Sequence, residues 1–279
     1  MKNNFIQSIF SLKKKVAIVS GAGGFFGKAF SECLLMAGAK VVLLGKGGKI
    51  RYFSESLKRK FGAQRVDHYQ VDFYDDQNYL KCLKNIVNKN STVDILVNNA
   101  FEFSKETGFN DPSGELERIS KNQWIRSFES GVYWHALAIQ VIGEKMKAQK
   151  SGSIINVSSV YGLISPDPEL YKGVKVFNPP SYSVAKAAIL ALTRYTASFW
   201  GEYNIRCNAI VPGAFPNEDP KAFNTPKDQV FIKRLADRTV LKRTGKLNDL
   251  KGALIFLASD ASNYITGQAI VIDGGWTIR

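Results

Sequence analysis

The sequence predicts an α/β fold: a single Rossmann-like, doubly wound domain with about seven parallel strands and helices on both faces. Three observations predict it. Short apolar runs of strand length alternate with segments of helical period. A glycine-rich turn at 21–27 follows the first apolar run and opens a helical pattern, as in dinucleotide-binding βαβ units. No repeat, linker or low-complexity segment divides residues 1–279, so we expect one catalytic domain.

The composition is typical of a soluble globular protein. Hydrophobic residues make up 45% of the chain and charged residues 22%, and no run of eighteen apolar residues is present that could span a membrane. The N-terminus has one early lysine and no small-residue cleavage site, unlike a secretory signal. Three cysteines without metal-ligand spacing and two histidines argue against a bound metal and fit a reduced compartment. We therefore expect a cytoplasmic protein without a membrane partner.

The formal net charge of +14 is spread over the chain rather than gathered in one stripe. Lysine groups at 13–15, 58–60 and 145–150 fall in different predicted elements, which favours an ordinary solvated surface. No nucleic-acid reading motif accompanies them, so we do not expect a nucleic-acid partner. Such a positive field attracts anionic small molecules, including phosphates, nucleotides and acidic sugars.

The first half of the chain predicts a β–α–β–α–β unit after an N-terminal extension at 1–14. Strands are expected at 16–19, 39–44 and 66–71, the last closed by Asp72 and Phe73, with helices at 28–37 and 52–60.

The second half continues the alternation. Strands are expected at 93–97, 154–157, 205–213 and 269–272, and helices at 124–149, 181–192 and 249–258. A polar, glycine-punctuated loop is expected at 101–122, and the segments 160–181 and 214–246 are expected to form loops on the substrate side.

The glycine-rich turn carries the strongest single signal. Gly21 permits a tight turn, Gly23 and Gly24 let a pyrophosphate approach the backbone, and Gly27 lets the helix pack closely. The N-terminus of the following helix then offers free N–H groups and the positive end of its dipole to the phosphates. A glycine turn is not always a binding site, but the second strand at βαβ spacing favours dinucleotide binding.

The end of the second strand bears on the choice between NAD(H) and NADP(H). An acidic residue there usually holds the ribose 2′-hydroxyl, but the sequence at 44–49 is Leu-Gly-Lys-Gly-Gly-Lys. Lys46 or Lys49 is suited to pair with a 2′-phosphate, so NADP(H) is favoured. NAD(H) stays an alternative, since a Gly/Lys loop can also be an ordinary solvated turn.

Tyr182 and Lys186 stand four residues apart on a predicted helix, so their side chains share one face. An ammonium near a phenol stabilises the phenolate and is expected to lower the pKa of Tyr182 toward the working range. Such a phenol can pass a proton to or from a substrate oxygen. A Tyr-x-x-x-Lys pair alone is a common coincidence, but here a strand ending in Ser158 and Ser159 precedes it.

The motifs in order are the glycine turn, NNA, NVSS, YSVAK, RCNAIVPG and TGQAIVIDGG. This series resembles the short-chain dehydrogenase/reductase family, classical type, from about Lys15 to the C-terminus. The sequence is also similar to the branch found in bacterial flagellin modification and legionaminic-type nonulosonic acid synthesis.

The resemblance implies a catalytic set of Ser159, Tyr182 and Lys186, with Ser159 binding the substrate oxygen, Tyr182 acting as acid/base and Lys186 also binding the nicotinamide ribose. Asn217 stands where the family has a nicotinamide-contacting threonine. The candidate cofactor contacts are Ser20, Gly21, Gly24, Phe26, Gly27, Lys46, Asp72, Phe73, Asn98, Ala100, Tyr182, Lys186, Pro212, Gly213 and Asn217.

The implied activity is hydride transfer between nicotinamide and a secondary alcohol or ketone, on a sugar or nucleotide-activated nonulosonic sugar of surface-glycan biosynthesis. The alternatives are a 3-oxoacyl carrier-protein reductase-like or general carbonyl reductase, and a non-catalytic cofactor-binding protein. The family resemblance and the apolar segment 270–276 also imply a homotetramer or homodimer.

Three departures from the family pattern stand out. Phe25 occupies the position of the usual second glycine, so the spacing of the turn resembles the extended type. Gly131 aligns with the family's active-site asparagine, which would leave its water to Ser130 or a backbone carbonyl. Ser159 and Tyr182 lie 23 residues apart, because an insertion spans 166–180.

Overall fold

The computed structural model describes residues 5–217 and 226–279. Its centre is one sheet of seven parallel strands in the order β3-β2-β1-β4-β5-β6-β7, which confirms the predicted fold class. The strands are β1 (Val16–Ser20), β2 (Lys40–Gly45), β3 (Val66–Gln70), β4 (Ile95–Asn98), β5 (Gly152–Val157), β6 (Ile205–Pro212) and β7 (Ala269–Ile272).

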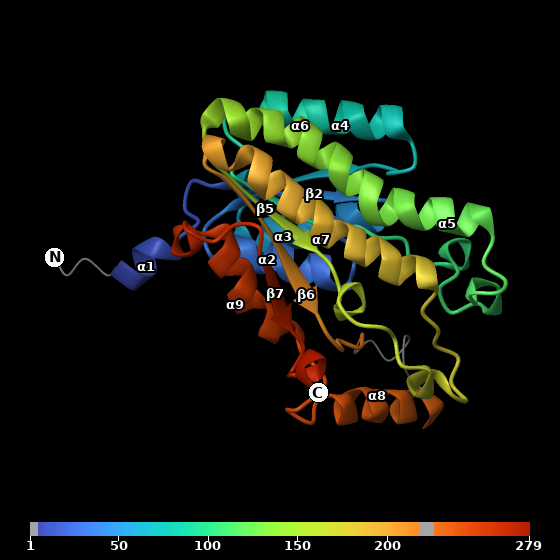
Figure 1. Cartoon of the computed structure of the whole chain (residues 1–279). Helices are drawn as coiled ribbons and strands as arrows, with labels where there is room; N and C mark the ends of the chain where they lie inside the picture. The colour runs from blue at the N-terminus through green and yellow to red at the C-terminus, as the bar shows by residue number, and fades with distance from the viewer. Residues whose placement is uncertain (1–4, 218–225) are drawn as a thin grey trace.

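Helices cover both faces of the sheet (Figure 1). One layer contains α2 (Phe25–Met36), α3 (Lys49–Phe61) and α9 (Leu247–Ala258), and the other contains α4 (Asp76–Lys89), α6 (Trp134–Gln149) and α7 (Pro180–Trp200). Successive side chains of a strand point to opposite faces. Val41 and Leu43 of β2 accordingly join the first core, and Val42 and Leu44 join the second.

The remaining helices lie outside these layers. The short α1 (Phe5–Ile9) projects from the body, and α5 (Lys121–Phe128) leads into α6 through a π-helical turn at Glu129–Tyr133. The last helix, α8 (Pro226–Arg238), lies at the rim near the C-terminus (Figure 1).

The order of the strands creates a crevice at the carboxyl ends of the central strands β1 and β4. From β1 the chain moves outward through β2 and β3, and then returns to β4 on the opposite side of β1. In open α/β sheets, ligands bind at such a switch point, outside the carboxyl ends of the strands. The glycine turn after β1 and the NNA segment after β4 meet there.

The structure differs from the sequence-based expectation in three elements. Helix α4 was not predicted, although Asp75 caps it by accepting a hydrogen bond from the Asn78 amide at 3.0 Å. Helix α8 lies within the expected loop 214–246, and its buried Phe231 and Leu235 show the four-residue spacing of an apolar helical face. The single helix expected at 124–149 is two helices joined by the π-helical turn.

Candidate active site

A cavity of about 540 Å³ opens at the carboxyl ends of the strands. Ser159 lines it. Ten of the predicted cofactor residues also line it, namely Gly21, Gly24, Phe26, Lys46, Asp72, Phe73, Ala100, Tyr182, Pro212 and Gly213. The other predicted cofactor residues, Ser20, Gly27, Asn98, Lys186 and Asn217, are not part of its wall.

The glycine turn is shaped by contacts between backbones. Gly21 has a φ of +64°, and a Cβ atom there would lie 2.9 Å from the Cα of Ala100. A Cβ on Gly27 would lie 2.1 Å from the carbonyl oxygen of Gly21, whereas a Cβ on Gly23 would meet only a methyl of Ile50 at 3.9 Å. The turn therefore requires glycine at 21 and 27 and leaves open space beside Gly23, a cradle into which a pyrophosphate fits.

Ser20 and Asn99 support this turn from behind. The Ser20 hydroxyl accepts hydrogen bonds from the amides of Asn99 and Ala100 at 3.0 and 3.1 Å. The Asn99 side chain donates to the carbonyls of Ser20 and Gly21 at 3.1 and 3.2 Å, and Asn99 also lines the cavity. Asn98 points elsewhere: it is fully buried and donates to Asn156 of the adjacent strand at 2.9 Å. Asn99, which sequence reasoning passed over, is thus the cavity residue of this pair.

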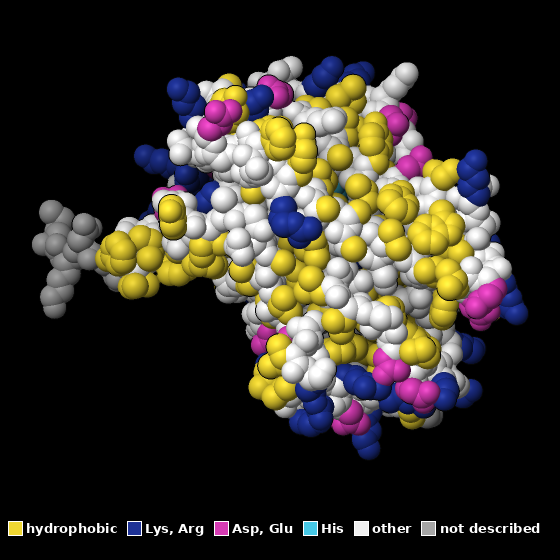
Figure 2. Space-filling model, viewed as in Figure 1, with side chains coloured by type: hydrophobic (Ala, Val, Ile, Leu, Met, Phe, Trp, Pro, Cys, Tyr) yellow, Lys and Arg dark blue, Asp and Glu magenta, His cyan; other side chains and the backbone are white. Residues whose placement is uncertain are grey.

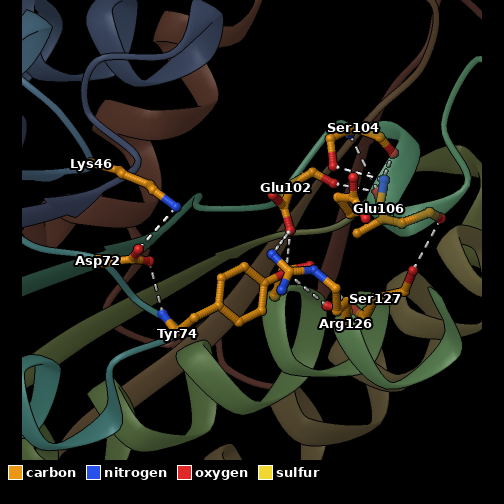
Figure 3. Close-up of polar contacts among 10 residues, drawn as sticks. Lys46, Asp72, Tyr74, Glu102, Ser104, Glu106, Arg126 and Ser127 are labelled. Atoms are coloured by element: carbon orange, nitrogen blue, oxygen red, sulfur yellow. Dashed lines mark hydrogen bonds and ion pairs between the residues drawn. The ribbon is translucent and has the colours of Figure 1, made fainter. Parts of the chain in front are cut away.

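Lys46 and Asp72, both predicted to contact the cofactor, form an ion pair at 2.9 Å at one end of the cavity (Figure 3). Partial burial opposes ionisation of Asp72, but the hydrogen bonds from Lys46 and from the Tyr74 amide outweigh it and lower the pKa of the carboxyl. The Asp72 carboxyl is therefore ionised at neutral pH.

Next to this pair lies a polar cluster that the sequence did not reveal. Arg126 donates to Glu102 at 2.8 Å and stacks 3.8 Å above the centre of the Tyr74 ring, and the Tyr74 hydroxyl donates to the same carboxylate (Figure 3). Glu102 and Tyr74 line the cavity. The cluster joins the expected loop 101–122 to α5, so residues far apart in the sequence close one wall.

The three predicted catalytic residues lie close together. Tyr182 and Ser159 both line the cavity, and the Ser159 hydroxyl accepts a hydrogen bond from the Tyr161 amide at 3.2 Å. Lys186 lies behind them with 3% of its surface exposed, its Nζ 5.7 Å from the centre of the Tyr182 ring. Its amine donates to the carbonyl of Val157 at 2.9 Å. Ser158 has a structural role, since its hydroxyl donates to the carbonyl of Lys186 at 2.7 Å.

The pKa shifts in this group differ from the expectation. Burial raises the pKa of Tyr182 to about 12, and the neighbouring Ser159 side chain offsets part of this rise. Burial also lowers the pKa of the Lys186 amine to about 7. We expected the lysine to lower the pKa of the phenol, but removal from water dominates for both side chains, and each is driven toward its neutral form.

An aromatic wall provides much of this burial. Phe101, Phe103 and Phe109 surround the Tyr182 ring, with distances between ring centres of 5.2, 6.0 and 5.0 Å. Phe101 and Phe103 also line the cavity. In the sequence these residues belong to a polar loop without periodicity, so no pattern identified them as part of the site.

The Gly131 position is closed to larger residues. A Cβ there would lie 2.8 Å from the Cβ of Ala185 and 3.0 Å from Cε2 of Phe101, so no asparagine fits without movement of the ring. Ser130, which was expected to hold the water in place of an asparagine, is fully buried and donates to the carbonyl of Ser127 at 3.4 Å. The Ser130 hydroxyl is therefore bonded within its own helix.

The loop 160–181, which contains the insertion at 166–180, is anchored by hydrogen bonds within itself and to α8. Asn178 donates to the Tyr171 hydroxyl at 2.9 Å, and Tyr171 donates to the Tyr161 hydroxyl at 2.9 Å. Arg234 of α8 donates to the carbonyl of Leu170 in the same segment at 3.1 Å. The insertion and α8 together form the rim beyond Ser159.

Neither a membrane span nor a metal centre is found in the part of the chain that the structure describes. Within 5–217 and 226–279, no helix is both long and apolar enough to cross a bilayer. The same residues contain no group of three His, Cys, Asp or Glu side chains that could hold a metal ion.

Comparison with known proteins gives consistent results. A family profile described as enoyl-(acyl carrier protein) reductase matches residues 26–277. The chain is 32% identical over 275 residues to the sorbose reductase of Candida albicans, a match that covers 98% of this chain and 90% of the relative. It is 28% identical over 276 residues to the 2-dehydro-3-deoxy-D-gluconate 5-dehydrogenase of Dickeya dadantii, covering 98% and 100%. The solved gluconate 5-dehydrogenase of Burkholderia cenocepacia, in complex with NADP and tartrate, superposes with a TM-score of 0.81 at 26% identity, covering 98% of this chain and 99% of that one.

Fold, cavity and relatives define a nicotinamide-dependent oxidoreductase. The chain belongs to the short-chain dehydrogenase/reductase family, classical type, whose members act on CH–OH groups with NAD or NADP. The expected kinship with the flagellin-modification and legionaminic branch stays a prediction.

Proposed function

We propose that this enzyme uses NADP(H) to interconvert a secondary alcohol and a ketone on a sugar. The observation that carries the proposal is the placement of Ser159 and Tyr182 together at the wall of the dinucleotide-sized cavity, with the Lys186 amine directly behind. A non-catalytic cofactor-binding role would give no reason to assemble these three groups around one point of the cavity.

The roles follow from the geometry. When bound, the nicotinamide supplies or accepts the hydride. Tyr182 gives a proton to the substrate oxygen in reduction and removes it in oxidation, and Ser159 holds that oxygen through its hydroxyl. Lys186 provides a buried positive charge or proton next to the phenol. The residues around the glycine turn, Gly21 to Gly24, would hold the pyrophosphate, and Pro212 and Gly213 would border the nicotinamide.

Several features support a sugar as substrate. The two curated relatives named above carry sugar or sugar-acid names, and the solved neighbour is a gluconate dehydrogenase. The aromatic wall of Phe101, Phe103 and Phe109 offers apolar ring faces on which the C–H face of a sugar ring can lie. The net charge of +14 favours an anionic or nucleotide-activated sugar, such as a nonulosonic acid precursor of surface glycans.

A second candidate is reduction of the 3-keto group of a 3-oxoacyl thioester. The description of the matching family profile and the apolar character of the same wall favour it. Incubation of the enzyme with NADPH or NADH and keto-sugars, nucleotide-sugars or acyl thioesters separates the two candidates by which substrate class turns over.

We further propose that the enzyme forms a homodimer or homotetramer through α5, α6 and α7. Figure 2 shows hydrophobic side chains gathered over this face. Among the exposed residues of α7 are Tyr195 and Phe199, whose rings stack with centres 4.3 Å apart and which are 61% and 59% exposed. The apolar C-terminal segment is a weaker candidate, because Trp276 is buried in the core of its own chain. Sedimentation of a monomer at micromolar concentration would count against the proposal.

Replacement of the phenol tests the assignment of Tyr182. Tyr182→Phe removes one hydroxyl and little volume, so we expect kcat to fall about 10²- to 10⁴-fold with the cofactor affinity nearly unchanged. Tyr264→Phe, on a fully exposed side chain, is the matched control and should retain wild-type kcat. Retention of a tenth of the wild-type kcat by Tyr182→Phe would exclude it as the acid/base.

A further inference from the structure

The amine of Lys186 lies in a narrow space beside the ring of Phe101, a residue that belongs to no predicted motif. Its Nζ is 5.1 Å from the centre of the Phe101 ring and 5.7 Å from that of Tyr182. On the strand side, the carbonyl of Val157 accepts its hydrogen bond at 2.9 Å. The ring of Phe101 is therefore a cover over the amine as well as a neighbour of the catalytic phenol.

Gly131 makes room for this cover. The π-helical turn at Glu129–Tyr133 brings the Gly131 backbone so close that a Cβ would lie 3.0 and 3.3 Å from two carbons of the Phe101 ring. Any side chain at 131 would push the ring off the amine or would itself occupy the space beside it. Phe101 and Gly131 thus form a pair in which a large residue requires a small one.

We propose that Phe101 is a positioning residue that, with Gly131 as its obligatory partner, keeps Lys186 in a dry slot and closes that side of the active site to water. The inference rests on the proposed function, since it concerns how the same lysine serves Tyr182. It predicts that the ionisation of Lys186 depends on an uncharged residue 85 positions away in the sequence.

The groups that face the amine leave Lys186 as the one that titrates near neutrality. His135 of α6 is buried, and burial lowers its pKa to about 3. Tyr182 on the same helix has its pKa raised to about 12 by burial. Burial alone lowers the pKa of Lys186 to about 7, with no carboxylate contributing to the shift. A step near pH 7 in the pH dependence of kcat/KM would thus report Lys186.

The first experiment measures this step in Phe101→Ala, Phe101→Leu and Phe103→Ala. Removal of the cover admits water, which stabilises the ammonium, so Phe101→Ala should move the step upward by about one pH unit or more. Phe101→Leu keeps an apolar cover and should leave the step near its wild-type position. Phe103→Ala is the matched control: Phe103 belongs to the same wall but is 64% exposed, so the step should not move whatever happens to turnover.

The second experiment tests the pair through melting temperatures. Gly131→Asn should lower Tm strongly in the wild-type background and less in the Phe101→Ala background, where the collision with the ring is gone and the one with the Ala185 Cβ, at 2.8 Å, remains. Equal losses in both backgrounds, or an unmoved step in Phe101→Ala, would overturn the proposal. These outcomes are independent of Tyr182→Phe: an inactive Tyr182→Phe enzyme combined with an unmoved step would reject the role of Phe101 alone.

Discussion

Gly27 and Gly131 both lack room for a side chain, but for different reasons. At Gly27 a Cβ would collide with backbone, 2.1 Å from the carbonyl oxygen of Gly21 and 2.7 Å from the Cα of Ala22. At Gly131 it would collide with two side chains, Ala185 and Phe101. The first glycine shapes the glycine-rich turn, and the second packs against the Phe101 ring that lies over Lys186.

This difference determines which amino-acid substitutions each region can accept. A backbone collision cannot be relieved by a second substitution, because every residue type has the same main chain. A collision with a side chain can be relieved by shortening that side chain. We therefore expect the glycine turn to tolerate no substitution at residue 27, whereas the aromatic wall can accept paired substitutions at 101 and 131.

The largest expected effect is that of Gly27→Ala. Because the backbone must shift at the start of α2, we expect a loss of about 3 kcal/mol or more in the free energy of unfolding, and loss of cofactor binding. Gly23→Ala is the matched control, since a Cβ there meets only Ile50 at 3.9 Å. Gly23→Ala should keep the wild-type free energy of unfolding and lose only cofactor affinity. Denaturant unfolding and cofactor titration by fluorescence measure both quantities, and a stable Gly27→Ala that binds normally would contradict the contrast.

This contrast also explains what the sequence could and could not predict. The turn at 21–27 was predictable, because local chain geometry requires glycine at fixed spacing after a strand. The helix spacing of Tyr182 and Lys186 was equally visible. Phe101 and Gly131 were not predictable as a pair, because their contact depends on the path of a loop and on a π-helical turn that interrupts the expected helix. The same reason hid the cluster of Tyr74, Glu102 and Arg126.

Ala100 connects the two regions, and His135 holds it in place. The Ala100 amide bonds Ser20 of the glycine side, its carbonyl bonds Nε2 of His135 at 2.8 Å, and the next residue is Phe101. His135 is buried, and burial lowers its pKa to about 3 from the usual 6.5. Between these two pH values the unfolded chain binds a proton that the folded protein does not.

Stability should therefore fall as the pH drops from about 6.5 toward 3, by up to about 1.4 kcal/mol per pH unit from this residue. His135→Gln retains a donor for the Ala100 carbonyl and removes the titration, so its unfolding free energy should fall less between pH 6 and pH 4. His68→Gln is the comparison variant: His68 is only partly buried, and burial and the Lys58 charge lower its pKa too, so this variant should change the pH dependence in the same direction but less than His135→Gln. If His135→Gln and the wild type lose the same stability over this range, the histidine is not the acid-sensitive link between the two regions.

The smallest effect on stability is expected at the ion pair of Lys46 and Asp72, which follow β2 and β3 and line the same cavity as the glycine turn. Their side chains are 63% and 43% exposed, so Lys46→Ala should change the free energy of unfolding by less than about 0.5 kcal/mol. Its effect should appear in binding instead. Lys46 can exchange its bond to Asp72 for a 2′-phosphate, which NADPH has and NADH lacks, so Lys46→Ala should weaken NADPH several-fold and leave NADH nearly unchanged. Lys46→Asp should shift the preference further toward NADH, because the carboxylate repels the 2′-phosphate of NADPH.

Lys58→Ala, which removes an equal charge outside the cavity wall, controls for the general positive field. Equal losses for both cofactors in Lys46→Ala, or tighter binding of NADH than NADPH by the wild type, would remove Lys46 as the determinant of cofactor choice.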